Sequence, residues 1–216
     1  MARNVQRDEL EMERRKNQLM DAGFDLFSQY GIESVSLMKV AEVAGVGAAT
    51  LYNYYQNKVN LVTAISARKW SQVWENYRET KKEEDTKDKS AYRMMEEYAE
   101  AIIGIYREHP EILRFSSDYK TFISREHVGM DQVGAQFDAL QPVSDLFHVC
   151  YEKAQIDGTI RTDIPEHELF TTVALTMLGM AERYAQGLVW ANRADNEYTR
   201  ELTNLKDMLL LWLSNK

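Results

Sequence analysis

The segment VAEVAGVGAATLYNYYQNKVNLV, residues 40–62, gives the clearest indication of the architecture. It contains no acid pair, no set of metal ligands and no phosphate-binding glycine loop. Gly45 and Gly47 separate a short helical pattern of small residues from a second one that carries three tyrosines. Two short helices joined by a tight glycine-containing turn form a helix-turn-helix. The segment therefore predicts a helix-turn-helix rather than a catalytic site.

Helical periodicity extends over nearly the whole chain, without a convincing period-two strand pattern. We therefore expect an all-α protein. Ser36 and Asn57 are predicted N-caps, and Gly31 is a predicted left-handed C-cap whose Schellman motif packs Ile32 on Phe27. The predicted helices cover residues 8–30, 37–44, 47–54, 58–79, 91–107, 110–124, 132–156, 166–191 and 196–213, and residues 80–90 form a polar helix end and loop.

The composition narrows the class of protein. Hydrophobic residues make up 44% and charged residues 28% of the 216 residues, as in soluble globular proteins. No apolar run approaches the roughly 20 residues of a membrane helix, so we expect a cytoplasmic protein without membrane contact. The net charge of −8 argues against indiscriminate binding of polyanions. Cys150 is the only cysteine; we expect a buried thiol, with a redox sensor as the alternative.

The predicted third helix has a slim outer face. Leu51 and either Tyr54 or Tyr55 are expected to point inward, and a face of small residues can enter a major groove about 12 Å wide. The residues expected at this face are Gly47, Ala48, Ala49, Thr50, Tyr52 and Asn53.

Lys58 lies in the first turn of the predicted fourth helix, where its charge opposes the helix dipole by roughly 0.3–1 kcal/mol. Free backbone N–H groups beside a lysine form an anion site, and a DNA phosphate is the expected occupant. Tyr52 is expected to donate its hydroxyl to a neighbouring phosphate, with Ser36 and Thr50 as further contacts. The alternative is that Lys58 points into water.

Residues 22–62 resemble the N-terminal domain of the TetR (tetracycline-repressor-like) transcriptional regulators. The resemblance implies a helix-turn-helix DNA-binding domain, residues 1–60, and a larger helical ligand-binding and dimerisation domain, residues 61–216. Beyond residue 62 it is architectural only. The matching residues are Ala22, Leu26-Phe27, Gly31, Ser36, Val40-Ala41, Ala44-Gly45-Val46, Thr50-Leu51-Tyr52, Tyr54-Tyr55, Lys58 and Leu61.

Two positions depart from the family pattern, because Gly47 replaces the usual serine and Tyr55 the usual phenylalanine. Small residues at the leading edge cannot make bidentate base contacts. We therefore expect specificity from thymine methyl contacts, Asn53 and DNA shape. The first 60 residues hold seven Lys/Arg and eight Asp/Glu, so this segment is not basic overall. Because the basic residues cluster in the N-terminal arm and at the helix starts, we expect binding that is modest without the correct register and strongly salt-dependent. An N-terminal arm with Arg3 and Arg7 either reaches a minor groove or is disordered.

The last two predicted helices have broad apolar faces, part of which must pack within the subunit. Leu209, Leu210 and Leu211 make the final helix apolar around most of its circumference, which favours a homodimer with a four-helix interface. Such a dimer places two recognition helices about 34–36 Å apart on a palindromic operator in double-stranded DNA. The residues of the two faces are Leu169, Val173, Met177, Ala181, Tyr184 and Leu188, and Tyr198, Leu202, Leu205, Leu209 and Trp212.

Aromatic residues of the middle helices are expected to form either plain core or, as a set, a pocket for an apolar or aromatic small-molecule effector. Its binding would swing the fourth helix and respace the two recognition helices. The candidate ligand-binding residues are Trp70, Trp74, Tyr77, Tyr106, Phe115, Tyr119, Phe122, Phe147 and Tyr151.

The sequence does not favour an enzyme, a cofactor or a metal site. Its four histidines lack metal-ligand spacing, and nucleophile-elbow, Walker and dinucleotide patterns are absent. We expect a transcriptional regulator, a repressor released by its effector. The alternative is a helix-turn-helix adaptor whose large domain binds a protein partner, and a thermal-shift screen against small molecules discriminates the two.

Overall fold

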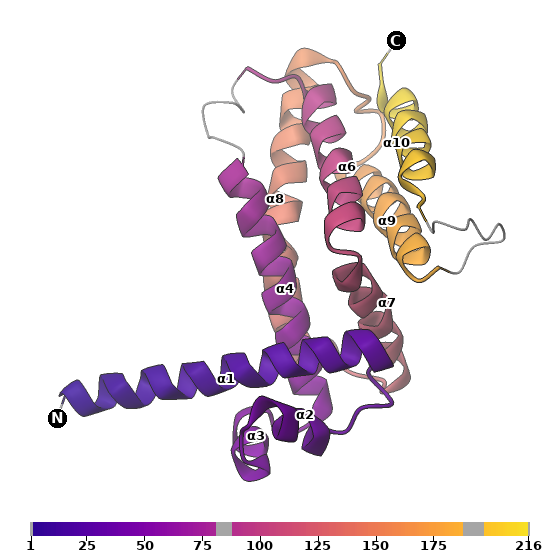
Figure 1. The fold of residues 1–216 in the computed structure, drawn as a ribbon. Helices are drawn as coiled ribbons and strands as arrows, with labels where there is room; N and C mark the ends of the chain where they lie inside the picture. Colours follow the sequence, from indigo (N-terminus) through magenta and orange to yellow (C-terminus); the bar gives the residue numbers. More distant parts are fainter. Residues whose placement is uncertain (1, 81–87, 188–196, 216) are drawn as a thin grey trace. The chain divides into compact units, whose positions relative to one another are not determined.

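The computed structural model describes residues 2–80, 88–187 and 197–215, and only the backbone of residues 2–6. These ranges form helices joined by turns, with one isolated antiparallel bridge between Ile160 and Ser214, which confirms the all-α fold (Figure 1). No helix in the described ranges has both the length and the apolar character needed to cross a membrane. The chain forms two compact units, Met1–Trp70 with Phe115–Ala139, and Ser71–Arg114 with Leu140–Lys216. The functional division after residue 60 stays a prediction.

The first unit holds α1 (Ala2–Tyr30), α2 (Leu37–Ala44), α3 (Ala48–Tyr55), the start of α4 (Lys58–Thr80), the end of α7 (Pro110–Arg125) and the 3-10 turn η1 (Met130–Gln132). Its core draws one large side chain from each long element: Phe27 of α1, Leu51 of α3, Leu61 of α4 and Phe115 of α7 are at most 1% exposed. Burial of such side chains stabilises the unit by about 1.5–3 kcal/mol each. The recognition helix is therefore held on a packed support.

The second unit holds the rest of α4 and α7, α6 (Ala91–Glu108), most of α8 (Gly134–Asp157), α9 (Glu166–Ala185) and α10 (Thr199–Leu213). An aromatic chain fills its interior, with ring centroids 6.2 Å apart between Trp74 and Tyr98, 4.6 Å between Tyr98 and Phe147 and 4.5 Å between Phe147 and Phe170. Cys150 of the same unit is buried with its thiol donating to the Ala91 carbonyl at 3.3 Å, and burial raises the pKa of this thiol to about 12. The prediction of a buried thiol is confirmed.

Two predicted helix boundaries need correction. The first helix begins at Ala2 rather than Asp8, so Arg7 lies on a helix and not on an arm; the side chain of Arg3 is outside the described residues. Glu11 pairs with Arg14 and Arg15 one turn away, which supports helix in this segment. The helix predicted to reach residue 191 ends at Ala185.

Left-handed glycines follow the C-terminal ends of α1 and α9. Gly187 has φ +72 and follows the last turn of α9. Two predictions lie outside the described residues: the apolar face position Leu188 and most of the polar loop, residues 81–87. Gly31 is left-handed as predicted, with φ +81, but its N–H bonds the Phe27 carbonyl at 2.8 Å. That single bond is the simpler αL motif and not the predicted Schellman motif.

Candidate nucleic-acid interface

The turn between α2 and α3 is closed by backbone hydrogen bonds at both helix ends. Gly45, at φ +64, donates to the Glu42 carbonyl at 3.2 Å, and Val46 donates to the Ala41 carbonyl at 3.0 Å. This pair of bonds is a Schellman motif, which needs a left-handed residue at Gly45. Gly47 is extended and forms the N-cap of α3 as predicted, without a side-chain hydrogen bond.

α3 buries one face and leaves the predicted DNA-facing side accessible. Leu51 is 0% and Tyr55 7% exposed, so Tyr55 rather than Tyr54 points inward. The Tyr55 hydroxyl donates to the Lys16 carbonyl at 3.4 Å, and burial raises the pKa of Tyr55 to about 12. On the other side, Gly47, Ala49, Tyr52 and Asn53 are exposed, while Ala48 and Thr50 are partly buried.

Ser36 and Asn57 hold the neighbouring helix ends. The Ser36 Oγ accepts the Lys39 N–H at 3.2 Å, and the Asn57 Oδ1 accepts the Asn60 N–H at 2.9 Å. Both predicted N-caps are therefore confirmed. Ser36 is exposed and keeps its hydroxyl proton for another acceptor.

The alternative that Lys58 points into water is wrong, since its side chain turns into the protein, and its phosphate contact stays a prediction. Its Nζ donates to the Glu33 carbonyl at 3.2 Å and lies 5.9 Å from the Phe27 ring centroid and 5.8 Å from that of Phe122. Desolvation lowers the pKa of Lys58, against the opposing effect of Glu33 and Glu126. The DNA-free protein thus holds this ammonium over two aromatic rings rather than in water.

The nine candidate ligand-binding residues are divided between the two units. Phe115, Tyr119 and Phe122 of α7 and Trp70 of α4 belong to the first unit, where the Phe115 ring packs on Phe24 with centroids 5.4 Å apart. The Tyr119 hydroxyl there lies 3.4 Å from the Thr63 hydroxyl. The remaining five residues, Trp74, Tyr77, Tyr106, Phe147 and Tyr151, belong to the second unit.

Within the second unit, these aromatics have structural contacts. Trp74 and Phe147 are part of the aromatic chain, and Tyr77 packs edge-on against Trp74 with centroids 5.9 Å apart. The Tyr151 hydroxyl donates to the carbonyls of Thr162 and Ile164, at 3.2 and 2.9 Å. Their role in ligand binding stays a prediction.

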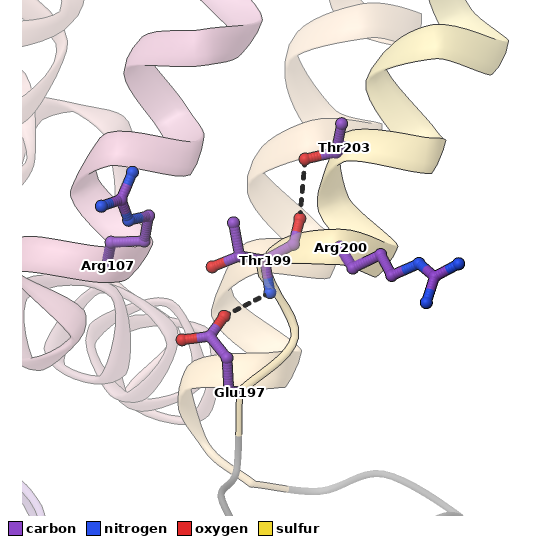
Figure 2. Close-up of a pocket in the computed structure, with 5 residues that line it drawn as sticks. All are labelled: Arg107, Glu197, Thr199, Arg200 and Thr203. Atoms are coloured by element: carbon purple, nitrogen blue, oxygen red, sulfur yellow. Dashed lines mark hydrogen bonds between the residues drawn. The ribbon is translucent and has the colours of Figure 1, made fainter.

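Two cavities of the second unit have polar linings that the sequence reading did not select. The first, about 360 Å³, is lined by the ends of α6 and α9, the start of α7 and Glu197; Tyr106 is the predicted ligand residue in its wall. The second, about 540 Å³, shares Arg107 and Glu197 and adds the start of α10. Figure 2 shows Arg107 on one side of it and Thr199 and Glu197 on the other, with Arg200 extending away. Arginines on both sides of the His109-Pro110 break, Arg107 and Arg114, are the sequence signal that was missed.

Comparisons with known proteins agree with this geometry. Residues 19–65 match the model of the bacterial regulatory proteins of the tetR family. Over 59 residues the chain is 40% identical to the HTH-type transcriptional repressor KstR of Rhodococcus jostii (strain RHA1). That match covers 27% of this chain and only 28% of the relative.

Solved structures share the fold over nearly the whole chain. The fatty acid degradation regulator FadR from Bacillus halodurans is 12% identical with a TM-score of 0.66, and the match covers 91% of this chain and 94% of that one. A tetR-family regulatory protein from Rhodococcus RHA1 is 12% identical with a TM-score of 0.67, covering 94% of this chain and 98% of that one. The match to the tetR family model is confined to residues 19–65, and the solved structures share the fold, so the chain resembles the tetR family of bacterial regulatory proteins in its N-terminal segment.

Proposed function

We propose that the protein is a sequence-specific, DNA-binding transcriptional regulator of the cytoplasm. It represses from a palindromic operator and is released by a small-molecule effector. The observation that carries this proposal is α3 itself, where buried Leu51 and Tyr55 anchor a helix whose opposite side exposes Ala49, Tyr52 and Asn53. A slim exposed helix on a rigid support is what entry into a major groove requires.

The proposed contacts follow from the chemistry of each side chain. Gly47, Ala48 and Ala49 allow close approach and apolar contact with thymine methyl groups, and the Asn53 amide reads a base edge. Phosphate contacts come from the hydroxyls of Ser36, Thr50 and Tyr52 and from the Lys58 ammonium.

The larger domain, residues 61–216, is proposed to bind the effector and a second copy of the chain. Apolar side chains remain exposed on its last two helices: Leu175 of α9 is 64%, Met208 of α10 68% and Leu211 of α10 61% exposed. These side chains support a homodimer, because burying them against an equivalent face recovers their hydrophobic free energy. The effector is proposed to have an apolar or aromatic body.

Selection of bound sequences from random duplex DNA, followed by competition binding, tests the DNA-binding function. The expected product is a palindromic site that purified protein prefers over its scrambled version. Asn53→Asp should abolish that preference because it sets a carboxylate against the DNA, whereas Asn76→Asp makes the same charge change at an exposed position of α4 and should bind normally. Equal binding of site and scrambled competitor at low salt would refute the function.

A further inference from the structure

The cavity of about 360 Å³ in the second unit combines aromatic and cationic walls. Tyr106 and Tyr184 face each other edge to face, with ring centroids 6.5 Å apart, and Tyr184 stacks on Tyr198 at 4.7 Å. The Tyr198 N–H donates to the Tyr106 hydroxyl at 3.1 Å, which fixes this group of rings. A wall of mutually packed rings is a rigid surface for a flat molecule.

The charges in the cavity wall do not cancel. Arg107 is exposed and makes no hydrogen bond or ion pair with any residue that the structure describes. Arg114 is partly buried and gives one N–H to the Ala185 carbonyl at 3.4 Å, which leaves most of its five donors. The carboxylate of Glu197 is engaged by the Thr199 N–H at 2.6 Å, at the start of α10.

This excess of positive charge is local, because the chain as a whole carries −8. Guanidinium groups bind carboxylates and phosphates through paired, charge-assisted hydrogen bonds, and these are stronger than neutral ones. The adjoining cavity offers a further group, since the Thr199 Oγ1 is buried and has no hydrogen-bond partner among the described residues.

We propose that this cavity binds a small aromatic acid, a molecule of one or two rings that carries a carboxylate or phosphate. The rings lie against Tyr106 and Tyr184, and the acid group bonds Arg107 and Arg114. A volume of about 360 Å³ lies within the roughly 300–1,000 Å³ of ligand sites and accommodates a body of one or two rings. The role of this site as an effector site rests on the proposed function, whereas binding of the aromatic acid does not.

Calorimetric titration of the full chain tests the site with three probes: 2-naphthoate, 2-naphthyl phosphate and the uncharged naphthalene-2-methanol. At least one anion is expected to bind about tenfold more tightly than the alcohol, because a charge-assisted hydrogen bond contributes about 1.5–3 kcal/mol. The stronger of the two anions identifies the acid group. Equal affinity for the alcohol and both anions would overturn the proposal.

Arg107→Gln is the test variant, because Arg107 is exposed and makes no hydrogen bond or ion pair with the described residues. It should weaken anion binding about tenfold, and Arg114→Gln should act in the same direction. Arg78→Gln, at an exposed arginine of α4, should leave binding unchanged. If Arg107→Gln changes the oligomeric state in sedimentation and not the anion affinity, Arg107 serves a subunit contact and the proposal fails.

Operator binding is measured separately in the same preparations. Normal operator binding without anion preference would refute this site and leave the regulator intact. Anion binding that depends on Arg107 in a protein without operator preference would support the site and refute the regulatory function.

Discussion

The ammonium of Lys58 is less well solvated in the fold than in water, which its lowered pKa records. The Lys58 side chain is partly buried, and its ammonium donates one hydrogen bond to the Glu33 carbonyl. A phosphate at the N-terminus of α4 would add negative charge in a better solvated place than the one Lys58 shares with Glu33 and Glu126. The side chain therefore has a physical reason to turn outward when DNA arrives.

Lys58→Met should keep the fold and weaken operator binding. Methionine removes an ammonium whose charged form is disfavoured by desolvation at this position. The thermal stability should therefore be unchanged or slightly higher. The slope of log K against log salt should fall in magnitude by about 1, as expected for one lost phosphate contact. Fluorescence anisotropy at several salt concentrations measures it, with Lys39→Met on α2 as the comparison. Lost affinity with an unchanged slope would instead make Lys58 a positioning residue.

Gly45→Ala should destabilise the first unit by about 1–2 kcal/mol, because the backbone is left-handed at φ +64 and a Cβ is strained there. The added Cβ meets nothing within 4 Å, so the cost is conformational and not steric. Gly104→Ala is the matched control, since Gly104 sits inside α6 with open space around it. That change should stabilise by about 0.5–1 kcal/mol. Urea denaturation measures both, and equal signs would contradict the interpretation.

The sequence predicts side chains whose partners are local and misses those whose partners are distant. Ser36, Gly47 and Asn57 cap helices through backbone groups three residues away, so their role can be predicted from the local sequence. The orientation of the Lys58 side chain depends on Glu33 and Phe122, which are distant in the sequence. Helical periodicity does not predict that these residues are close in space.

At the scale of elements, α1 and α4 approach each other at a glycine. A Cβ on Gly23 would lie 2.7 Å from the Ile65 Cδ1, and Ile65 is 0% exposed. Gly23→Ala should therefore destabilise by about 1–3 kcal/mol through overpacking, despite better helix propensity. Ile65→Val removes the clashing methyl and costs about 0.5–1.5 kcal/mol alone. The double variant should be more stable than the sum of the two changes predicts, and additive losses in urea denaturation would refute the close approach.

His148 of α8 joins the first turn of α9, where its Nδ1 lies 3.1 Å from both carboxylate oxygens of Glu166. The hydrogen bond to Glu166 raises the pKa of His148, and Glu152 and Asp145 act in the same direction. A raised folded-state pKa stabilises the fold below the unfolded value and loses this effect as pH rises through the folded value. His148→Gln should lower the melting temperature slightly at about pH 5.5 and not at about pH 8.5. An equal loss at both pH values would contradict this charge pairing.

Helical periodicity predicts which faces are apolar but not what covers them. Phe115, Tyr119 and Phe122 have a helical spacing that fits either core or a ligand pocket, and they pack in the unit of the recognition helix. The apolar stripe of α9 likewise serves the subunit itself, because Val173 and Met177 are at most 1% exposed. An amphipathic pattern has the same form whether its partner is another helix, a ligand or a second chain.

For the whole molecule, the apolar residues left on α9 and α10 determine the proposed assembly. Leu202 and Leu210 are buried within the subunit, whereas Met208 and Leu211, three residues apart, share an exposed face of α10. Trp212 adjoins them, with its ring 5.0 Å from the Arg161 guanidinium. The excess apolar surface expected from Leu209–Leu211 is therefore present, though on fewer side chains than the sequence suggested.

Leu211→Glu should convert a dimer into a monomer, because two equivalent carboxylates would be buried without partners at a two-fold interface. Ile156→Glu is the matched control, since Ile156 is 82% exposed on α8, which is not one of the two proposed interface helices. Sedimentation equilibrium at micromolar concentration should separate the two variants. The monomer should bind a full palindrome no better than a half-site, because a single recognition helix spans only one groove. A Leu211→Glu variant that stays dimeric and keeps its preference for the palindrome would place the subunit contact elsewhere on the chain.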